Sequence, residues 1–308
     1  MTWQTLLGLT VLGSIVTTLG SLLALCIKEF VAARWLEHWK ARQTLLGVYR
    51  RYQLPIFLAA EELSGRLYGL SREGNDREER DIGLDVLRNG APRPDHAAVG
   101  EHYLRYRFVS NVYRLCSFLG WVELYRRDIG TLDVDTLDRN RKLAACLRDI
   151  QGVLADGWIN QHADWRHWRD CLLFREEQRA IGHAMAASEG GLAILDFGTF
   201  TAALEGDLDG TGQARWFVQA AHFYECLKRS QDFRLVRMRM LVVYLTDLME
   251  LLQPGRIDRS HVTTAEHYRR SFERLTGGPA WRTAPLSPSA LPVHAAAAVA
   301  QPKEACHA

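Results

Sequence analysis

The sequence lacks the short motifs by which the common classes of enzyme are identified. It contains no HExxH zinc motif, no GxSxG nucleophile motif, no GxxxxGK phosphate loop and no GxGxxG dinucleotide fingerprint. No Glu-x-x-His pair falls in the helices predicted below, which disfavours a ferritin-like di-metal bundle. We therefore predict no metal and no cofactor. The absence of these motifs favours a protein without enzymatic activity, and an enzyme remains the alternative.

Cysteine pairs are also lacking. The six cysteines are scattered at positions 26, 116, 146, 171, 226 and 306, with no CxxC pair and no metal-ligand spacing. Free buried thiols are ordinary in a reducing compartment. The cysteine pattern therefore favours a domain that lies in the cytoplasm.

Strand signals are nearly absent, and the best of them is the short stretch Leu192–Phe200. Apolar residues between Leu104 and Ile129 instead recur at steps of three, four and seven, which predicts a helix over 98–130. We expect Pro55 in the first turn of a helix, Asp133 or Asp135 as an N-cap, and Pro254-Gly255 as a stop. The fold class is thus all-α, a helical bundle, with further helices predicted near 30–50, 55–70, 135–156, 163–187, 212–229 and 231–252.

An uncharged and mostly apolar run, Thr5–Ile27, lies near the start of the chain. A helix of this length reaches roughly 34 Å, enough to cross a bilayer core of about 30 Å. A secretory signal peptide would have a positively charged start and a small-x-small cleavage site, and neither is present. We predict an uncleaved single transmembrane helix over residues 1–28.

Charge after this run predicts the orientation. Six basic and two acidic residues in Lys28–Arg51 give a net charge of +4, whereas Met-Thr-Trp-Gln before the run is uncharged. The positive side stays cytoplasmic, so we expect the N-terminus outside, the main domain inside, and contact with anionic lipid headgroups. Trp3, Trp35 and Trp39 are either anchors at the membrane interface or residues packed within the next helix.

Small residues recur at intervals of four in the predicted span, at Gly13, Thr17 and Ser21. Such residues let two helix backbones approach closely in lipid, which would permit self-association. The same residue types are common in any span, so the alternative is that this line packs against nothing.

The rest of the chain suits one domain over 29–275, with a loop over 71–96. Five of the nine prolines and an alanine run fall in 276–308, which predicts a disordered tail. The net charge of +2 argues against a dedicated nucleic-acid binder. Asp207–Gly212 resembles a calcium loop, but Val218 stands where the twelfth-position acid belongs, so we predict a turn.

Polar residues on or beside apolar helix faces are the candidate site. Arg126 continues the apolar line of its helix, Gln178 and Glu177 lie in and beside the next such line, and Glu62 and Arg66 flank a third. A partly buried arginine requires a carboxylate, so we predict that Arg126 meets Glu177 or Glu62 across helices. This cluster is either an ion-pair network that fixes helix register or a small-anion pocket with Glu177 as acid or base.

Arg234, Arg237 and Arg239 form a second basic group on one predicted helix. A face of this kind is more often solvated than part of a binding site. We therefore expect these three arginines to lie in solvent.

Three segments carry a resemblance: FLAAEELSGRLYGL, FLGWVELYRRDI and FREEQRAIGHAM, in this order behind a single span. In these the chain resembles a widespread family of uncharacterised bacterial membrane-anchored helical proteins, over roughly residues 5–255. The resemblance implies a bacterial inner-membrane setting and marks Glu62, Arg66, Arg126, Glu177 and Gln178 as structural residues. It implies no activity.

Two functions follow from these observations. The first is a membrane-anchored interaction or scaffold protein that binds a cytoplasmic protein or itself. The second is a membrane-associated enzyme or small-anion sensor that uses the Arg/Glu cluster in the bundle core.

Overall fold

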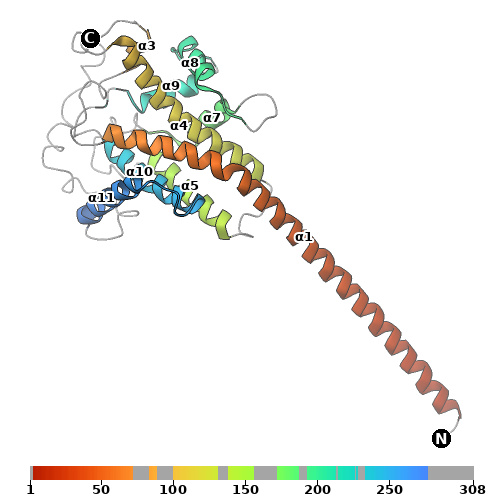
Figure 1. Cartoon of the computed structure of the whole chain (residues 1–308). Coiled ribbons are helices and arrows are strands. Elements are labelled where there is room, and N and C mark those ends of the chain that lie inside the picture. Colours follow the sequence, from red (N-terminus) through yellow and green to blue (C-terminus); the bar gives the residue numbers. More distant parts are fainter. Residues whose placement is uncertain are drawn as a thin grey trace.

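The described residues form an all-α fold in which a long N-terminal helix leads into a packed bundle (Figure 1). A computed structural model describes residues 3–71, 83–88, 100–130, 138–155, 172–186, 193–212, 214–225, 227 and 233–276. The predicted fold class is confirmed. Where a strand signal was strongest, the described residues instead form an isolated bridge between Ala186 and Ile194 and the start of helix α8 (Phe197–Gly206).

Helix α1 (Trp3–Ser71) is continuous over 69 residues, which makes it about 100 Å long. The prediction of two helices separated before Pro55 is therefore wrong, because Pro55 lies inside α1. Proline removes one backbone hydrogen bond from a helix. Tyr52 and Ile56 on either side are buried in the bundle, and this packing holds the helix together through the proline.

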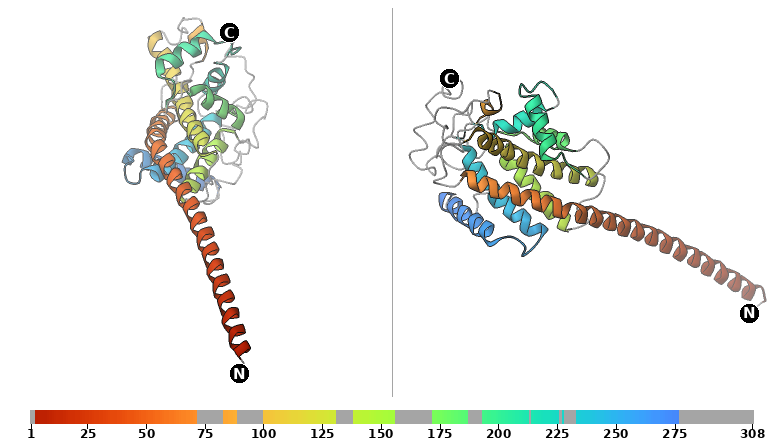
Figure 2. Two further views of the ribbon diagram at one scale, coloured as in Figure 1. Left: turned by 90° about the vertical axis from the view of Figure 1, so that its right-hand side faces the viewer. Right: turned by 45° about the horizontal axis from the view of Figure 1, so that its top comes forward.

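The two halves of α1 lie in different surroundings. Every residue from 13 to 40 is exposed, whichever way its side chain points. From Leu45 onward one side of α1 is buried, and the helix becomes part of the core. Figure 2 shows the first half projecting from the bundle as a single rod.

Two helices pack along the buried side of α1, and both run antiparallel to it. Helix α4 (Glu101–Ile129) brings Asp128 to Tyr52, whose hydroxyl donates to the Asp128 carboxylate at 2.9 Å. Helix α10 (Phe233–Leu252) brings Leu251 to Tyr49 and Arg239 to Ser71. The predicted ranges of 98–130 and 231–252 agree closely with these two helices.

The remaining helices cover the outer sides of α4 and α10. They are α3 (Asp85–Arg88), α5 (Asp138–Ala155), α7 (Arg175–Met185), α9 (Arg215–His222) and α11 (Arg259–Thr276). Helices α3, α8 and α11 were not predicted, and α3 lies within the predicted loop 71–96. In α11 the buried residues Ala265, Tyr268 and Phe272 form a narrow stripe that packs on α10. Asp133, Asp135, the tail after 276 and most of the predicted loop 71–96 lie outside the described residues.

Helices α4 and α7 cross at very short range, and glycines make this possible. A β-carbon on Gly182 would lie 2.6 Å from the Leu119 carbonyl oxygen and 2.7 Å from Glu123 Cβ. A β-carbon on Gly120 would lie 2.9 Å from Met185 Cβ. Only glycine fits at such a separation, so this crossing fixes α7 on the bundle.

Candidate functional site

The projecting half of α1 contains a segment long and apolar enough to cross a membrane. Trp35 and Trp39, which follow this segment, are 66% and 48% exposed. They do not pack within the bundle, so the second of the two interpretations of these tryptophans fails for the described residues. The side chain of Trp3 lies outside the described residues.

The small polar residues of this segment satisfy their own hydroxyl groups. Thr17 Oγ1 donates to the Gly13 carbonyl at 2.7 Å, and Ser21 Oγ donates to the Thr17 carbonyl at 2.9 Å. No hydroxyl of this line therefore needs water or a second helix, which suits an apolar environment. Whether Gly13, Thr17 and Ser21 pack against another helix stays a prediction.

Arg126 has a different partner from those predicted. Its Nε and Nη2 atoms both donate to the Glu123 carboxylate, each at 2.7 Å, so the pair is bidentate. The Arg126 side chain is 46% exposed and that of Glu123 is 8% exposed. The hydrogen bonds that Arg126 donates to the Glu123 carboxylate raise the pKa of Arg126. The predicted cross-helix pairs with Glu177 and Glu62 are wrong, because the neighbour one turn earlier supplies the carboxylate.

Glu177 and Gln178 serve the start of α7. The Phe174 backbone N–H donates to the Glu177 carboxylate at 2.8 Å, so Glu177 caps its own helix. Gln178 is buried, and its amide nitrogen donates to the carbonyls of Leu173 at 2.7 Å and Gln151 at 3.0 Å. Gln178 thus ties α7 to α5.

Glu62 and Arg66 lie at a seam between α1 and α4. Arg66 is buried, and its Nε atom donates to the Asn111 amide oxygen on α4. Glu62 is exposed and lies 3.9 Å from the guanidinium of Arg114. The five predicted residues therefore occupy three separate places, at this seam, at the end of α4 and at the start of α7. They do not form one pocket.

Cys116 and Tyr224 are buried ionisable side chains of types that can act together in catalysis. Burial raises the pKa of both the Cys116 thiol and the Tyr224 hydroxyl. A thiol held in its protonated form is a poor nucleophile. These residues therefore contribute to packing in the core, as most buried cysteines do.

In the basic group of α10, Arg234 and Arg237 are buried and Arg239 is partly buried, so the prediction that all three lie in solvent is wrong. Arg234 donates to the carbonyls of His222 at 3.1 Å and Glu225 at 2.6 Å, at the end of α9. Arg237 is fully buried and donates to the Val153 carbonyl near the end of α5. Arg239 donates through two nitrogens to the Ser71 carbonyl at the end of α1. Each arginine meets the negative end of a different helix dipole.

Helices α1 and α10 cap each other at both ends of their contact. Arg239 of α10 holds the last carbonyl of α1 at 3.0 Å. At the opposite end, Tyr49 and Gln53 of α1 donate to the carbonyls of Leu251 and Leu252, the last two residues of α10. The two helices are therefore fixed to each other along their length. These contacts could not be predicted from the sequence, because they join residues far apart in the chain.

The calcium-like segment forms a turn, as predicted. The Asp207 carboxylate accepts hydrogen bonds from the backbone N–H groups of Thr211 at 3.1 Å, Gly212 at 2.9 Å and Ala214 at 3.1 Å. This carboxylate is already used by the backbone, and it positions the start of α9. Across the described residues, no cluster of histidine, cysteine or acidic side chains suits a metal ion.

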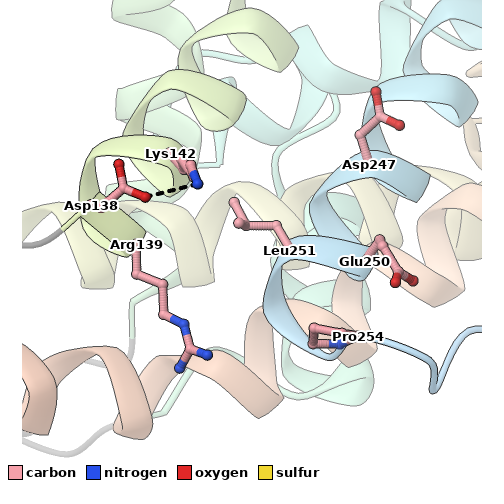
Figure 3. A pocket seen from close by; sticks show the side chains of 7 residues that line it. All are labelled: Asp138, Arg139, Lys142, Asp247, Glu250, Leu251 and Pro254. Atoms are coloured by element: carbon pink, nitrogen blue, oxygen red, sulfur yellow. Dashed lines mark ion pairs between the residues drawn. The ribbon is translucent and has the colours of Figure 1, made fainter.

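An open cleft of about 470 Å³ lies between the start of α5 and the end of α10 (Figure 3). Most of its charges are paired: Asp138 with Lys142 at 2.7 Å, and Asp247 with Arg269 at 2.6 Å. Arg139 differs, since its guanidinium makes no ion pair among the described residues and lies 5.7 Å from the centre of the Tyr49 ring. Because Tyr49 also meets the end of α10, the cleft lies at the end of the bundle from which the projecting half of α1 emerges.

Comparisons with protein-family models, with curated proteins and with solved structures give no match. The resemblance to a family of membrane-anchored helical proteins therefore stays a prediction. The function has to be argued from the geometry alone.

Proposed function

We propose that this protein is a single-span membrane-anchored scaffold that holds its helical domain at a set distance from the bilayer. The observation that carries the proposal is the continuity of α1. The same helix supplies the exposed apolar segment and, from Leu45 onward, a buried element of the core. A simple tether requires only a flexible linker, whereas this helix also fixes orientation.

The distance follows from helix geometry. From Ile27, at the end of the apolar run, to Leu45 the helix rises roughly 27 Å. The positive charge of Lys28–Arg51 supports a cytoplasmic domain in a bacterial inner membrane. At that height the bundle faces cytoplasmic proteins instead of lipid tails, and we propose a cytoplasmic protein as its partner.

Crosslinking in intact cells tests the scaffold. The tagged full-length protein is crosslinked, purified and examined by mass spectrometry, beside an Arg139→Ala variant and an Arg126→Ala variant. We expect a reproducible protein partner that both variants retain. A C-terminal alkaline phosphatase fusion that is active would place the domain outside and overturn the orientation.

A second function is favoured by the cleft of Figure 3. Arg139 is a guanidinium in an open cleft without an ion-pair partner among the described residues, which suits a small anion or the acidic group of a metabolite. This is the sensor alternative, moved from the predicted Arg/Glu cluster to another site. A small molecule that copurifies with the wild-type chain and is lost from Arg139→Ala, with no protein partner, would favour it.

A further inference from the structure

The part of α1 between the apolar run and the bundle carries large apolar side chains that no other described residue covers. Val31, Trp35 and Trp39 are 58%, 66% and 48% exposed. They lie between Ile27, where the apolar run ends, and Leu45, where burial in the bundle begins. In Figure 2 this part of α1 belongs to the rod that leaves the bundle.

These apolar residues share one side of the helix with two cations. At about 100° per residue, Val31 and Trp39 lie within about 40° of Trp35 around the helix axis. Lys28 and Arg42 lie within about 20° of Trp35, one turn or more to either end of the apolar group. We refer to these five residues as the stripe.

Acidic residues lie away from the stripe. Glu29 and Glu37 are the acidic residues between Lys28 and Arg51. They lie about 120° and 160° from Trp35 around the helix axis. The side of α1 that carries the tryptophans is therefore both apolar and cationic.

A helix that left the bilayer upright would keep the stripe in water. Trp35 and Trp39 follow Ile27 by about 12 and 18 Å along the helix axis. The headgroup layer is only about 5–8 Å thick on each side of the bilayer. Both tryptophans would then lie beyond the headgroups.

A tilt of α1 toward the stripe brings the tryptophans back to the headgroups. Transmembrane helices tilt by up to about 40° from the bilayer normal. At that tilt the helix axis at Trp35 lies roughly 9 Å above the level of Ile27, and side chains on the lower side of the helix reach about 4 Å closer to the bilayer. Trp35 then lies within the headgroup layer, and Trp39 lies near its outer edge.

We propose that the stripe binds the anionic headgroup layer of the bilayer that α1 crosses, so that α1 is inserted with a tilt toward the stripe. The proposal rests on the membrane anchor proposed above. Tryptophan is enriched at membrane interfaces because its ring is apolar and its N–H group is polar, and cations beside it attract anionic lipids. The stripe also follows the apolar run within one continuous helix.

The charges of the stripe favour lipid over a second copy of the chain. In a parallel pair of α1 helices joined along the stripe, Lys28 and Arg42 would each face the same residue of the other copy. Like charges at such a distance repel, whereas lipid phosphates neutralise them.

The tilt determines which side of the bundle faces the bilayer. The line of the stripe continues along α1 to Gln53, whose amide donates to the carbonyl of Leu252 at the end of α10. The end of α10, with the cleft beside it, is therefore on the side that the tilt turns toward the lipid. Along the bilayer normal, the rise of roughly 27 Å from Ile27 to Leu45 becomes about 21 Å.

Depth-dependent fluorescence quenching tests the tilt. An environment-sensitive fluorescent amino acid is encoded at position 33, 35 or 37 of the full-length chain. Each chain is reconstituted in vesicles of phosphatidylcholine and phosphatidylglycerol in equal parts, with a nitroxide quencher on some lipid headgroups. Ala33 and Glu37 are the matched controls, because each is two residues from Trp35 and lies on the opposite side of the helix.

The two insertions predict different orders of quenching. An upright helix gives quenching that falls steadily from position 33 to position 37. We expect instead a maximum at position 35, at least about twofold above both neighbours, because the tilt lowers that side alone. A steady fall, or a minimum at position 35, overturns the proposal.

A substitution separates the stripe from the apolar character of the whole segment. With the fluorescent amino acid at position 39, Trp35→Ser should at least halve the quenching. Leu36→Ser is the matched control, because Leu36 is 43% exposed and lies about 100° from Trp35 around the helix axis. We expect Leu36→Ser to leave the quenching unchanged. Equal losses in the two variants contradict the stripe.

Vesicles of phosphatidylcholine alone test the cations. Without anionic lipid, the excess quenching at position 35 over positions 33 and 37 should fall at least about twofold. The same excess in both kinds of vesicle overturns the assignment of anionic headgroups as the partner.

Flotation of the same vesicles on a density gradient reports the anchor by itself. A chain that floats without a maximum at position 35 overturns the stripe and leaves the scaffold standing. A chain that does not float overturns the anchor and, with it, the stripe.

Discussion

Helix glycines occur in two opposite situations in this molecule. At Gly182 and Gly120, α4 and α7 are so close that a single added carbon would collide with a neighbour. At Gly47 on α1, the space that such a carbon would occupy is empty. The first pair is explained by the fold of one chain. Gly47 is not required by any neighbour among the described residues, and the two situations can be told apart by the sign of a substitution's effect on stability.

Gly182→Ala should have the largest effect on stability. The added methyl group would lie 2.6 Å from the Leu119 carbonyl oxygen, so α7 must move away from α4. We expect a loss of about 3 kcal/mol in the free energy of unfolding. Denaturant unfolding of the full-length protein in detergent, followed by circular dichroism, measures it. Unchanged stability would show that α4 and α7 do not cross at this separation.

Arg239→Met should lower the free energy of unfolding by about 2 kcal/mol, because it leaves the end of α1 without its charged cap. The same unfolding measurement applies. Arg270→Met is the control, since Arg270 pairs on an exposed helix surface with Glu266 at 3.3 Å. We expect a change below about 0.5 kcal/mol there. Equal losses of stability in the two variants would mean that the Arg239 contact does not stabilise the packing of α10 on α1.

In a double-mutant cycle, the effects of Arg126→Met and Glu123→Gln on the free energy of unfolding should be coupled by about 1 kcal/mol. The bidentate contact joins them, and Glu123 is buried beside the α4–α7 crossing. Arg126→Met and Glu177→Gln should instead be additive, since Glu177 caps α7. Coupling in the second cycle and additivity in the first would restore the cross-helix pair predicted from the sequence.

Gly47→Ala should have the smallest effect on stability, and it should stabilise the protein where the other substitutions destabilise it. Alanine fits the open space and favours the helix, so we expect a gain of about 0.5–1 kcal/mol. Thermal unfolding in detergent measures the shift, with Gly182→Ala beside it. A loss of stability from Gly47→Ala would erase the distinction between the two kinds of glycine.

The spacing of apolar residues along the sequence predicts most of the helices, whereas the rest of the fold depends on contacts between residues far apart in the chain. The apolar steps of α4 and the length of α10 were readable from the sequence because each helix buries one of its own faces. The prediction that a new helix begins at Pro55 was wrong, because packing of Tyr52 and Ile56 stabilises α1 by more than the loss of one hydrogen bond destabilises it. Helix α11 was missed because its buried stripe is narrow.

The candidate site was less predictable for a physical reason. Glu123 is three residues before Arg126, and that spacing was a usable signal for the observed pair. No local signal could place Arg234, Arg237 and Arg239, because their partners are carbonyls at the ends of α9, α5 and α1. Only the assembled bundle brings those helix ends to α10.

The contact between Ser71 and Arg239 also has a consequence for synthesis. These residues are 168 positions apart, and ribosomes add about 5–20 residues per second. The end of α1 therefore waits roughly 8–34 s for its cap. During that interval the apolar side of α1 beyond Leu45 has no α10 to cover it, so the nascent chain exposes an apolar surface until the bundle can close.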